Sequence, residues 1–206
     1  STKRTIDPCR YRENKIIEEK GRAELKAILK DFLTYAKMNT RSDATSQSIP
    51  TTPGQVELAL LLKDQLIEMG VADVAYYEKN SFVIGRLPGN PEKTAIGFIA
   101  HVDTADFEAE NIQPQIHENY DGKDVCLNKE KAIYMTTAEF PNLKDYVGET
   151  LITTDGTTLL GADDKAGIAE IIDALRILQT MDAHKRGDVW VAFGPDEEIG
   201  TGADRF

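Results

Sequence analysis

Acidic and imidazole side chains gather at three places in the sequence, and each place follows a short apolar segment. These groups are His101 with Asp103, Asp163 with Asp164, and the run Asp196, Glu197 and Glu198. In open α/β sheets, ligand sites form at the carboxyl ends of the strands. The groups are therefore expected to converge, although about 95 residues separate the first from the last. Imidazole and carboxylate donors without a thiolate suit zinc, cobalt or manganese, so the pattern predicts a metal site.

The segment Leu151–Ala169, LITTDGTTLLGADDKAGIA, places two adjacent carboxylates at the start of a predicted helix. Helix capping is the simplest interpretation, because Asp is favoured at an N-cap and is stabilised by the helix dipole. One Asp is enough for that role, which we assign to Asp164. Asp163 is then left to reach the crevice at the strand ends, where its two oxygens can bridge two cations. Lys165 is expected at a solvated position or beside the ligands.

His101 and Asp103 are two residues apart in the segment HVD, which is expected to be extended. Residues at this spacing point the same way, so Asp103 can accept the imidazole N–H, fix its tautomer and raise its basicity as a ligand. A histidine after a strand is also often only a hydrogen-bonded structural residue. The residues alone leave both interpretations of His101 open.

The acidic run at Asp196–Glu198 would, away from any site, be a solvated turn. Successive side chains of an extended backbone point to opposite sides, so Glu197 and Glu198 can take different roles. One can bind a metal while the other removes a proton from a metal-bound water. Hydrolysis requires this division of labour, and the residues alone do not decide which glutamate does which.

The elements that must position these residues can be read from the apolar pattern. Helical spacing predicts a helix that begins at Glu24, a second helix that ends at Gly70 and a third over Gly167–Gln179. Strands are expected at Val74–Tyr77, Ser81–Arg86, Ala95–Ala100, Leu151–Thr153 and Val189–Phe193. Strands that alternate with helices indicate an α/β fold, with a mostly parallel central sheet flanked by helices.

Three further details of the fold follow from the sequence. Ala95–Ala100 is continuously apolar, which is typical of a strand covered on both faces, and Trp190 is expected in the core. Residues 104–150 are too many for a structureless loop in a compact domain, so we expect a β-rich excursion beside the sheet.

The composition limits the classes of protein that this chain can represent. With 206 residues, 41% hydrophobic and 29% charged, it is an ordinary globular domain, and its net charge of −11 argues against nucleic acid or membrane partners. Phosphate-binding loops, dinucleotide fingerprints and nucleophile elbows are absent. Apolar runs are too short for a membrane span or signal peptide, which favours a cytoplasmic location. Cys9 and Cys126 are expected to be free thiols.

Four segments together resemble the dinuclear zinc exopeptidases, the family that includes glutamate carboxypeptidase and acetylornithine deacetylase. They are AIGFIAHVDTAD (95–106), PQIHENYDG (114–122), LITTDGTTLLGADDKAGIAEI (151–171) and VAFGPDEEIGTGA (191–203). GADDKAGIAEI joined to PDEEIG is the most specific part, and within the family the likeness is closest to aminopeptidases that act on tripeptides.

The resemblance implies a metallopeptidase catalytic domain with two Zn²⁺ ions, Co²⁺ or Mn²⁺ being possible substitutes. It assigns roles to five residues: His101 ligates one metal, Asp103 supports it, Asp163 bridges both, Glu197 is the general base and Glu198 ligates the second metal. It also implies short peptides as substrates, with the N-terminal residue of tripeptides released by attack of a metal-bridging water.

Members of that family are about twice as long as this chain, because a lid or dimerisation domain and the rest of the catalytic domain follow. We therefore expect residues 24–206 to be the N-terminal part of the catalytic domain, and residues 1–23 to be a mobile or helical extension. A carboxylate and a histidine ligand would lie in the missing part, so the 206-residue chain alone is expected to be inactive. A homodimer would form through the missing domain. The alternatives are a related deacylase, dipeptidase or carboxypeptidase, or an inactive metal-binding fragment.

Overall fold

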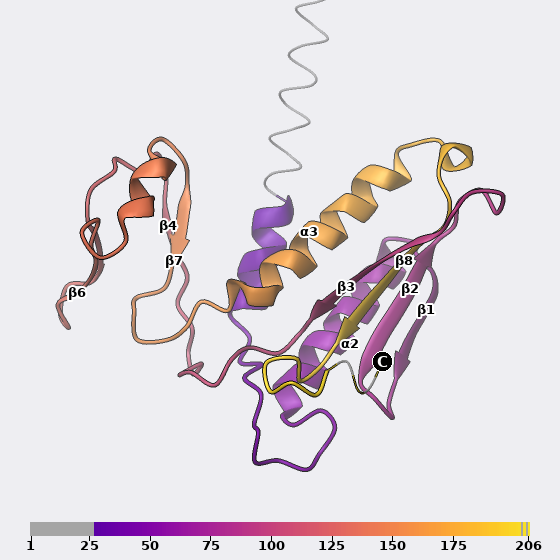
Figure 1. The fold of residues 1–206 in the computed structure, drawn as a ribbon, viewed down its shortest axis with the longest axis horizontal. Coiled ribbons are helices and arrows are strands. Elements are labelled where there is room, and N and C mark those ends of the chain that lie inside the picture. Colours follow the sequence, from indigo (N-terminus) through magenta and orange to yellow (C-terminus); the bar gives the residue numbers. More distant parts are fainter. Residues whose placement is uncertain (1–26, 203, 205) are drawn as a thin grey trace, which may run out of the picture.

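Three helices pack against one face of a four-stranded sheet in this computed structural model, which describes residues 27–202, 204 and 206 (Figure 1). The helices are α2 (Pro53–Glu68), α3 (Ala162–Gln179) and a helix whose described part spans residues 27–36. The predicted extension at residues 1–23, the helix start at Glu24 and Cys9 lie outside the described residues. None of the described helices has the length and hydrophobicity that crossing a membrane requires.

The central sheet contains β1 (Ala72–Tyr77), β2 (Phe82–Leu87), β8 (Val189–Gly194) and β3 (Ile96–His101), in that order. The α/β class with flanking helices is confirmed. The prediction of a mostly parallel sheet is wrong for the described residues, since only the pair β3–β8 of this sheet is parallel. The turn at residues 78–81 joins β1 directly to β2, and a connection that short can only make an antiparallel pair.

The parallel pair β3–β8 brings two of the predicted groups to one edge of the sheet. His101, the last residue of β3, is in register with Gly194, the last residue of β8. Two segments therefore leave the sheet side by side. One contains Asp103, and the other contains the acidic run.

A single apolar core joins the helices to this sheet. Its most deeply buried members include Leu58, Leu62 and Leu66 of α2, Ile168, Ile172 and Leu175 of α3, and Val83, Val191 and Phe193 of the sheet. Burial of such side chains contributes roughly 1.5–3 kcal/mol each. The core therefore holds the strand ends rigidly under the polar groups that follow them.

β3 was expected to be covered on both faces, and that prediction is wrong for the described chain. It is an edge strand, and Ile99 is 61% exposed. Trp190, expected in the core, is 40% exposed on the face of the sheet opposite the helices, where Arg86 lies over its ring. The described helices all cover the other face, which explains both exposures.

The β-rich excursion is confirmed, and it forms two small sheets beside the main one (Figure 1). β4 (Gln115–His117) pairs with β7 (Leu151–Thr153), and β5 (Val125–Asn128) pairs with β6 (Ile133–Met135). Short 3₁₀ helices occur at Pro141–Tyr146 in the excursion and at Ala183–Lys185 before β8. Cys126 is a free, exposed cysteine, as predicted. β7 was expected among the strands of one α/β sheet, but it lies outside the central sheet.

Candidate metal centre

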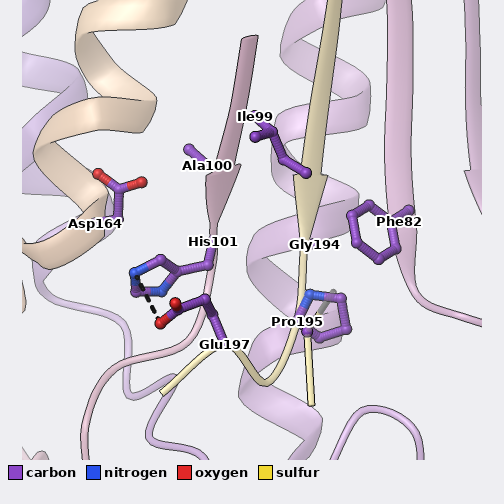
Figure 2. A pocket seen from close by; sticks show the side chains of 9 residues that line it. Phe82, Ile99, Ala100, His101, Asp164, Gly194, Pro195 and Glu197 are labelled. Carbon is purple, nitrogen blue, oxygen red and sulfur yellow. Dashed lines mark ion pairs between the residues drawn. The ribbon is translucent and has the colours of Figure 1, made fainter. Parts of the chain in front are cut away.

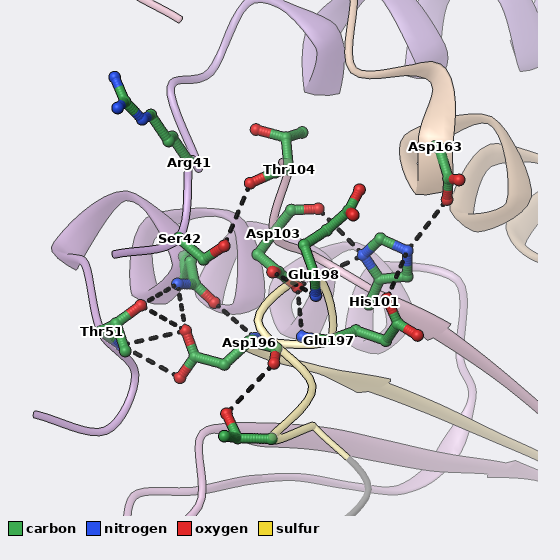
Figure 3. Close-up of polar contacts among 12 residues, drawn as sticks. Arg41, Ser42, Thr51, His101, Asp103, Thr104, Asp163, Asp196, Glu197 and Glu198 are labelled. Atoms are coloured by element: carbon green, nitrogen blue, oxygen red, sulfur yellow. Dashed lines mark hydrogen bonds and ion pairs between the residues drawn. The ribbon is translucent and has the colours of Figure 1, made fainter. Parts of the chain in front are cut away.

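The imidazole of His101 lies between carboxylates that come from three segments (Figure 3). Its Nδ1 is 3.0 Å from the backbone oxygen of Asp103 and 3.3 Å from Asp103 Oδ1. Its Nε2 is 3.0 Å from Asp163 Oδ1 and 3.8 Å from Glu197 Oε2. The imidazole is only 14% exposed, so its two nitrogens have fixed directions.

These neighbours strongly favour positive charge on the imidazole. Burial alone lowers the pKa of His101, but the hydrogen bonds and charge of Asp103, together with Asp163, outweigh it and raise the pKa to about 9. The site therefore attracts a proton when it holds no other cation. A bound metal ion would replace that proton at Nε2.

Asp103 has a second contact that the sequence pattern did not predict. Its carboxylate is fully buried, and its two oxygens accept the backbone N–H groups of Glu197 and Glu198 at 2.9 and 3.1 Å. The atom nearest to His101 Nδ1 is the Asp103 backbone carbonyl rather than the carboxylate. Asp103 thus holds both the imidazole and the acidic run.

The acidic run was expected to be extended, but it forms a turn. Asp196 has φ of 58°, and Gly200 N–H donates to the Glu197 carbonyl at 2.7 Å. Glu197 and Glu198 are both exposed, as expected for side chains that face a site. Burial raises the pKa of Glu198, and the nearby carboxylates of Asp163, Asp103 and Glu197 add to this effect against the opposing charge of His101.

Asp163 reaches this cluster from the start of α3, and not from a strand of the central sheet. Gly161 precedes it with φ of 70°, and regular helical geometry begins only after Asp164. Asp164 stands before that first regular turn, and a hydrogen bond from Gly167 N–H supports its carboxylate, which is the structural role predicted for it. Asp163 is left 84% exposed and points to His101.

Lys165 is completely buried, which excludes the solvated one of the two positions expected for it. Its Nζ donates to the backbone oxygen of Met38 at 2.7 Å, beyond the end of the first helix. Burial lowers the pKa of Lys165 to about 8. The long apolar stem and this hydrogen bond fasten the start of α3 to the neighbouring segment.

The ligand atoms of His101, Asp163 and Glu198 all lie within 4.8 Å of one another, and these are the three residues predicted as ligands. A tetrahedral zinc ion holds nitrogen and oxygen ligands at about 2.0–2.2 Å, which sets them about 3.3 Å apart. The distance between His101 Nε2 and Asp163 Oδ1, 3.0 Å, is close to that value. One nitrogen and two carboxylates form a donor set that fits a divalent cation. A small movement of the three side chains toward one another would bring their ligand atoms to the distances that one ion requires.

A cavity of about 230 Å³ opens beside this cluster (Figure 2). His101, Asp164 and Glu197 line its polar side, and Phe82, Ile99 and Pro195 are among the residues of its apolar side. Molecules that enter this space would meet the imidazole and the Glu197 carboxylate. The arrangement suits chemistry on a small organic molecule beside a cation.

Sequence reasoning missed two residues that contact the acidic run, Thr51 and Gln55. Both are buried and bind Asp196, which is itself fully buried. A signal for Gln55 was available, because it occupies the buried stripe of α2 in line with Leu58 and Leu62. A polar residue in an apolar stripe needs a hydrogen-bonding partner.

The sequence is closely similar to proteins named peptidase T. The one from Fusobacterium nucleatum is 58% identical over 177 residues, which are 85% of this chain and 43% of that protein. The one from Enterococcus faecalis is 59% identical over 182 residues, which are 87% of this chain and 44% of that protein. The chain thus spans less than half the length of these relatives. A scan against protein-family models gave no match.

Two solved structures share the fold. A tripeptidase from Staphylococcus aureus has a TM-score of 0.58 and 22% identity, with 88% of this chain and 39% of that chain covered. The aminopeptidase PepT from Bacillus cereus has a TM-score of 0.57 and 21% identity, with 85% and 37% covered. The chain is homologous to the peptidase T proteins over the part of their length that it spans.

Proposed function

We propose that this chain is part of a metal-dependent aminopeptidase that releases the N-terminal residue from tripeptides. The convergence of His101, Asp163 and Glu198, with Glu197 beside them, is the observation that carries the proposal. Homology to peptidase T supports a peptidase. The tripeptide as substrate is supported by the description of one protein of the same fold as a tripeptidase.

The cluster would hold its metal through His101, Asp163 and Glu198. Zinc suits these donors, as do cobalt and manganese, and two ions are proposed. Bound there, a divalent cation would polarise the scissile carbonyl and lower the pKa of a water molecule. Asp163 directs one oxygen to His101, and its carboxylate would help to hold both ions.

The remaining residues would orient groups and move a proton. Asp103 fixes His101 through Nδ1, which leaves Nε2 facing the cluster. Glu197 lies outside the ligand triad, is 62% exposed and reaches within 3.8 Å of Nε2. We assign it the role of general base, which takes the proton of the attacking water and delivers it to the departing amine.

Further ligands are proposed to come from outside these 206 residues, because three residues are too few to complete two metal sites. Residues 24–206 would then be the N-terminal part of a longer catalytic domain, and the chain alone would bind metal weakly and be inactive. A homodimer through the absent part and a cytoplasmic location complete the proposal.

Tripeptide hydrolysis tests the proposal, measured together with metal content. The assay uses this chain and a protein that carries the same sequence at the full length of its relatives. The longer protein is expected to bind two metal ions and to cleave a tripeptide whose C-terminus is amidated. It should not cleave one whose N-terminus is acetylated, because an aminopeptidase needs the amine. The reverse preference would indicate a carboxypeptidase or deacylase and would overturn the proposal.

A further inference from the structure

Side chains from two other segments bind the backbone of the acidic turn. Asp196 N–H donates to Gln55 Oε1 at 3.0 Å, while the N–H groups of Glu197 and Glu198 donate to the Asp103 carboxylate. Three successive peptide N–H groups therefore all donate to side-chain oxygens. These bonds fix the peptide planes from which the Glu197 and Glu198 side chains project.

The side chain of Asp196 turns away from the metal cluster and into the protein (Figure 3). It is fully buried, and its carboxylate accepts Gln55 Nε2 at 2.7 Å, Thr51 N–H at 3.1 Å and the Thr51 hydroxyl. A buried carboxylate requires such partners, because an unpaired one is strongly destabilising. Asp196 is thus an anchor for the turn.

Gln55 binds both the backbone and the side chain of this anchor. Its carbonyl oxygen accepts the Asp196 N–H and its amide nitrogen donates to the Asp196 carboxylate, so both ends of one amide contact one residue. Gln55 is itself buried, and it lies in the first turn of α2 on the stripe that packs in the core with Leu58 and Leu62. The rigid helix therefore sets the position of the turn across 141 residues of sequence.

We propose that Gln55 is a positioning residue of the metal centre. Through Asp196 it holds the turn so that Glu198 joins His101 and Asp163, and so that Glu197 stays just outside the triad. Gln55 touches neither metal nor substrate. Its effect on metal binding rests on the proposed function, whereas its hold on the turn does not.

An exchange of the two side chains tests the direct contact. Gln55→Glu places a second carboxylate beside that of Asp196, so that two acceptors face each other. Asp196→Asn places an amide N–H₂ beside the donors of Gln55 and Thr51, so that donors face each other. The double variant restores one acid and one amide, and the Thr51 hydroxyl can adapt because it both donates and accepts. We expect Gln55→Glu to weaken zinc binding by about 10-fold or more, in the range found for residues that orient metal ligands. Asp196→Asn should weaken it less, and the double variant should recover to within about 3-fold of wild type.

Two measurements on the 206-residue chain test these expectations. Zinc affinity is read by competition with a chromophoric indicator, and hydrogen exchange is read by NMR at the amides of Asp196, Glu197 and Glu198. Gln55→Leu should accelerate exchange at these amides by at least about 10-fold. Gln65→Leu is the matched control, since Gln65 lies on the same helix and binds the Tyr35 hydroxyl far from the turn. It should change neither measurement.

The outcomes separate this inference from the proposed function. Unchanged exchange at the three amides in Gln55→Leu would overturn the positioning role. A double variant that binds zinc no better than Gln55→Glu would also overturn it. If the wild-type chain binds no zinc, the metal centre is refuted, together with the part of the inference that concerns metal. Hydrogen exchange at the three amides then decides by itself whether Gln55 holds the turn.

Discussion

Nε2 of His101 lies 3.0 Å from Oδ1 of Asp163, although one residue ends a strand and the other precedes the regular part of a helix. This separation is close to the distance of about 3.3 Å between two ligands of one zinc ion, which is the role proposed for both residues. Asp163→Ala removes one of them and leaves His101 and Glu198. Zinc affinity of the chain should therefore fall at least about 10-fold, as measured by competition with a chromophoric indicator.

A control for this variant is Asp106→Ala, because Asp106 is an exposed carboxylate that pairs with Arg41 away from the cluster. Its zinc affinity should equal that of wild type. Equal losses in the two variants would mean that the overall negative charge, and not the His101 cluster, attracts the cation.

Glu197 is predicted to act on the proton and not to hold the metal. In the longer protein, Glu197→Ala should keep the metal content while kcat for a tripeptide falls by at least about 100-fold, the usual contribution of a general base. Metal analysis and steady-state kinetics on the same sample check this. Metal loss in Glu197→Ala equal to that in Asp163→Ala would contradict the division between base and ligand.

Zinc affinity should depend on pH over an unusually wide range. Because Asp103 and Asp163 help to raise the pKa of His101 to about 9, zinc must displace a proton from the imidazole at neutral pH. Apparent affinity should therefore rise with pH up to about 9 and then level off, whereas an ordinary histidine would level off near 6.5. Zinc titrations at several pH values check this, and NMR titration of the metal-free His101 ring gives the pKa directly. A ring that titrates near 6.5 would contradict the prediction.

The convergence of His101, Asp163 and Glu198 could be predicted because its sequence signals are local. An apolar strand that ends at His101 and another that ends before Asp196 are visible without any tertiary information, and the parallel pair then puts both ends at one edge. Asp163 was assigned to the cluster although its supposed strand, β7, lies outside the central sheet. Its position depends on the start of α3, where Asp164 alone takes the capping role.

Buried charge could not be predicted in the same way. Asp196 and Lys165 both stand among charged or polar neighbours, and such runs are usually solvated. Their burial depends on partners distant in sequence, Gln55 for Asp196 and the Met38 carbonyl for Lys165. The exposure of Ile99 was missed for the opposite reason, because an apolar run indicates what a strand can tolerate and not what covers it.

Lys165 should make the chain more stable at alkaline pH. Burial lowers its pKa to about 8 from 10.5, so between these values the unfolded chain binds more protons than the folded chain, and the free energy of unfolding rises with pH. Below pH 8 the lysine is charged in both states and the gain is absent. The full gain is on the order of 3 kcal/mol. Urea unfolding of wild type and Lys165→Met across this range checks it, since the variant lacks this rise. Parallel curves for the two proteins would contradict the burial of a charged Lys165.

Gly167→Ala should disturb the start of α3 through Asp164. A Cβ at position 167 would lie 2.1 Å from Asp164 Oδ1, so the carboxylate must leave its capping position and the peptide that carries Asp163 must shift with it. We expect a loss of about 1 kcal/mol in the free energy of unfolding, typical of a lost N-cap, together with weaker zinc binding. Gly97→Ala is the control, because a Cβ there meets nothing closer than 3.9 Å. If Gly167→Ala lowered stability but left zinc affinity at the wild-type value, the start of α3 would not be what positions Asp163.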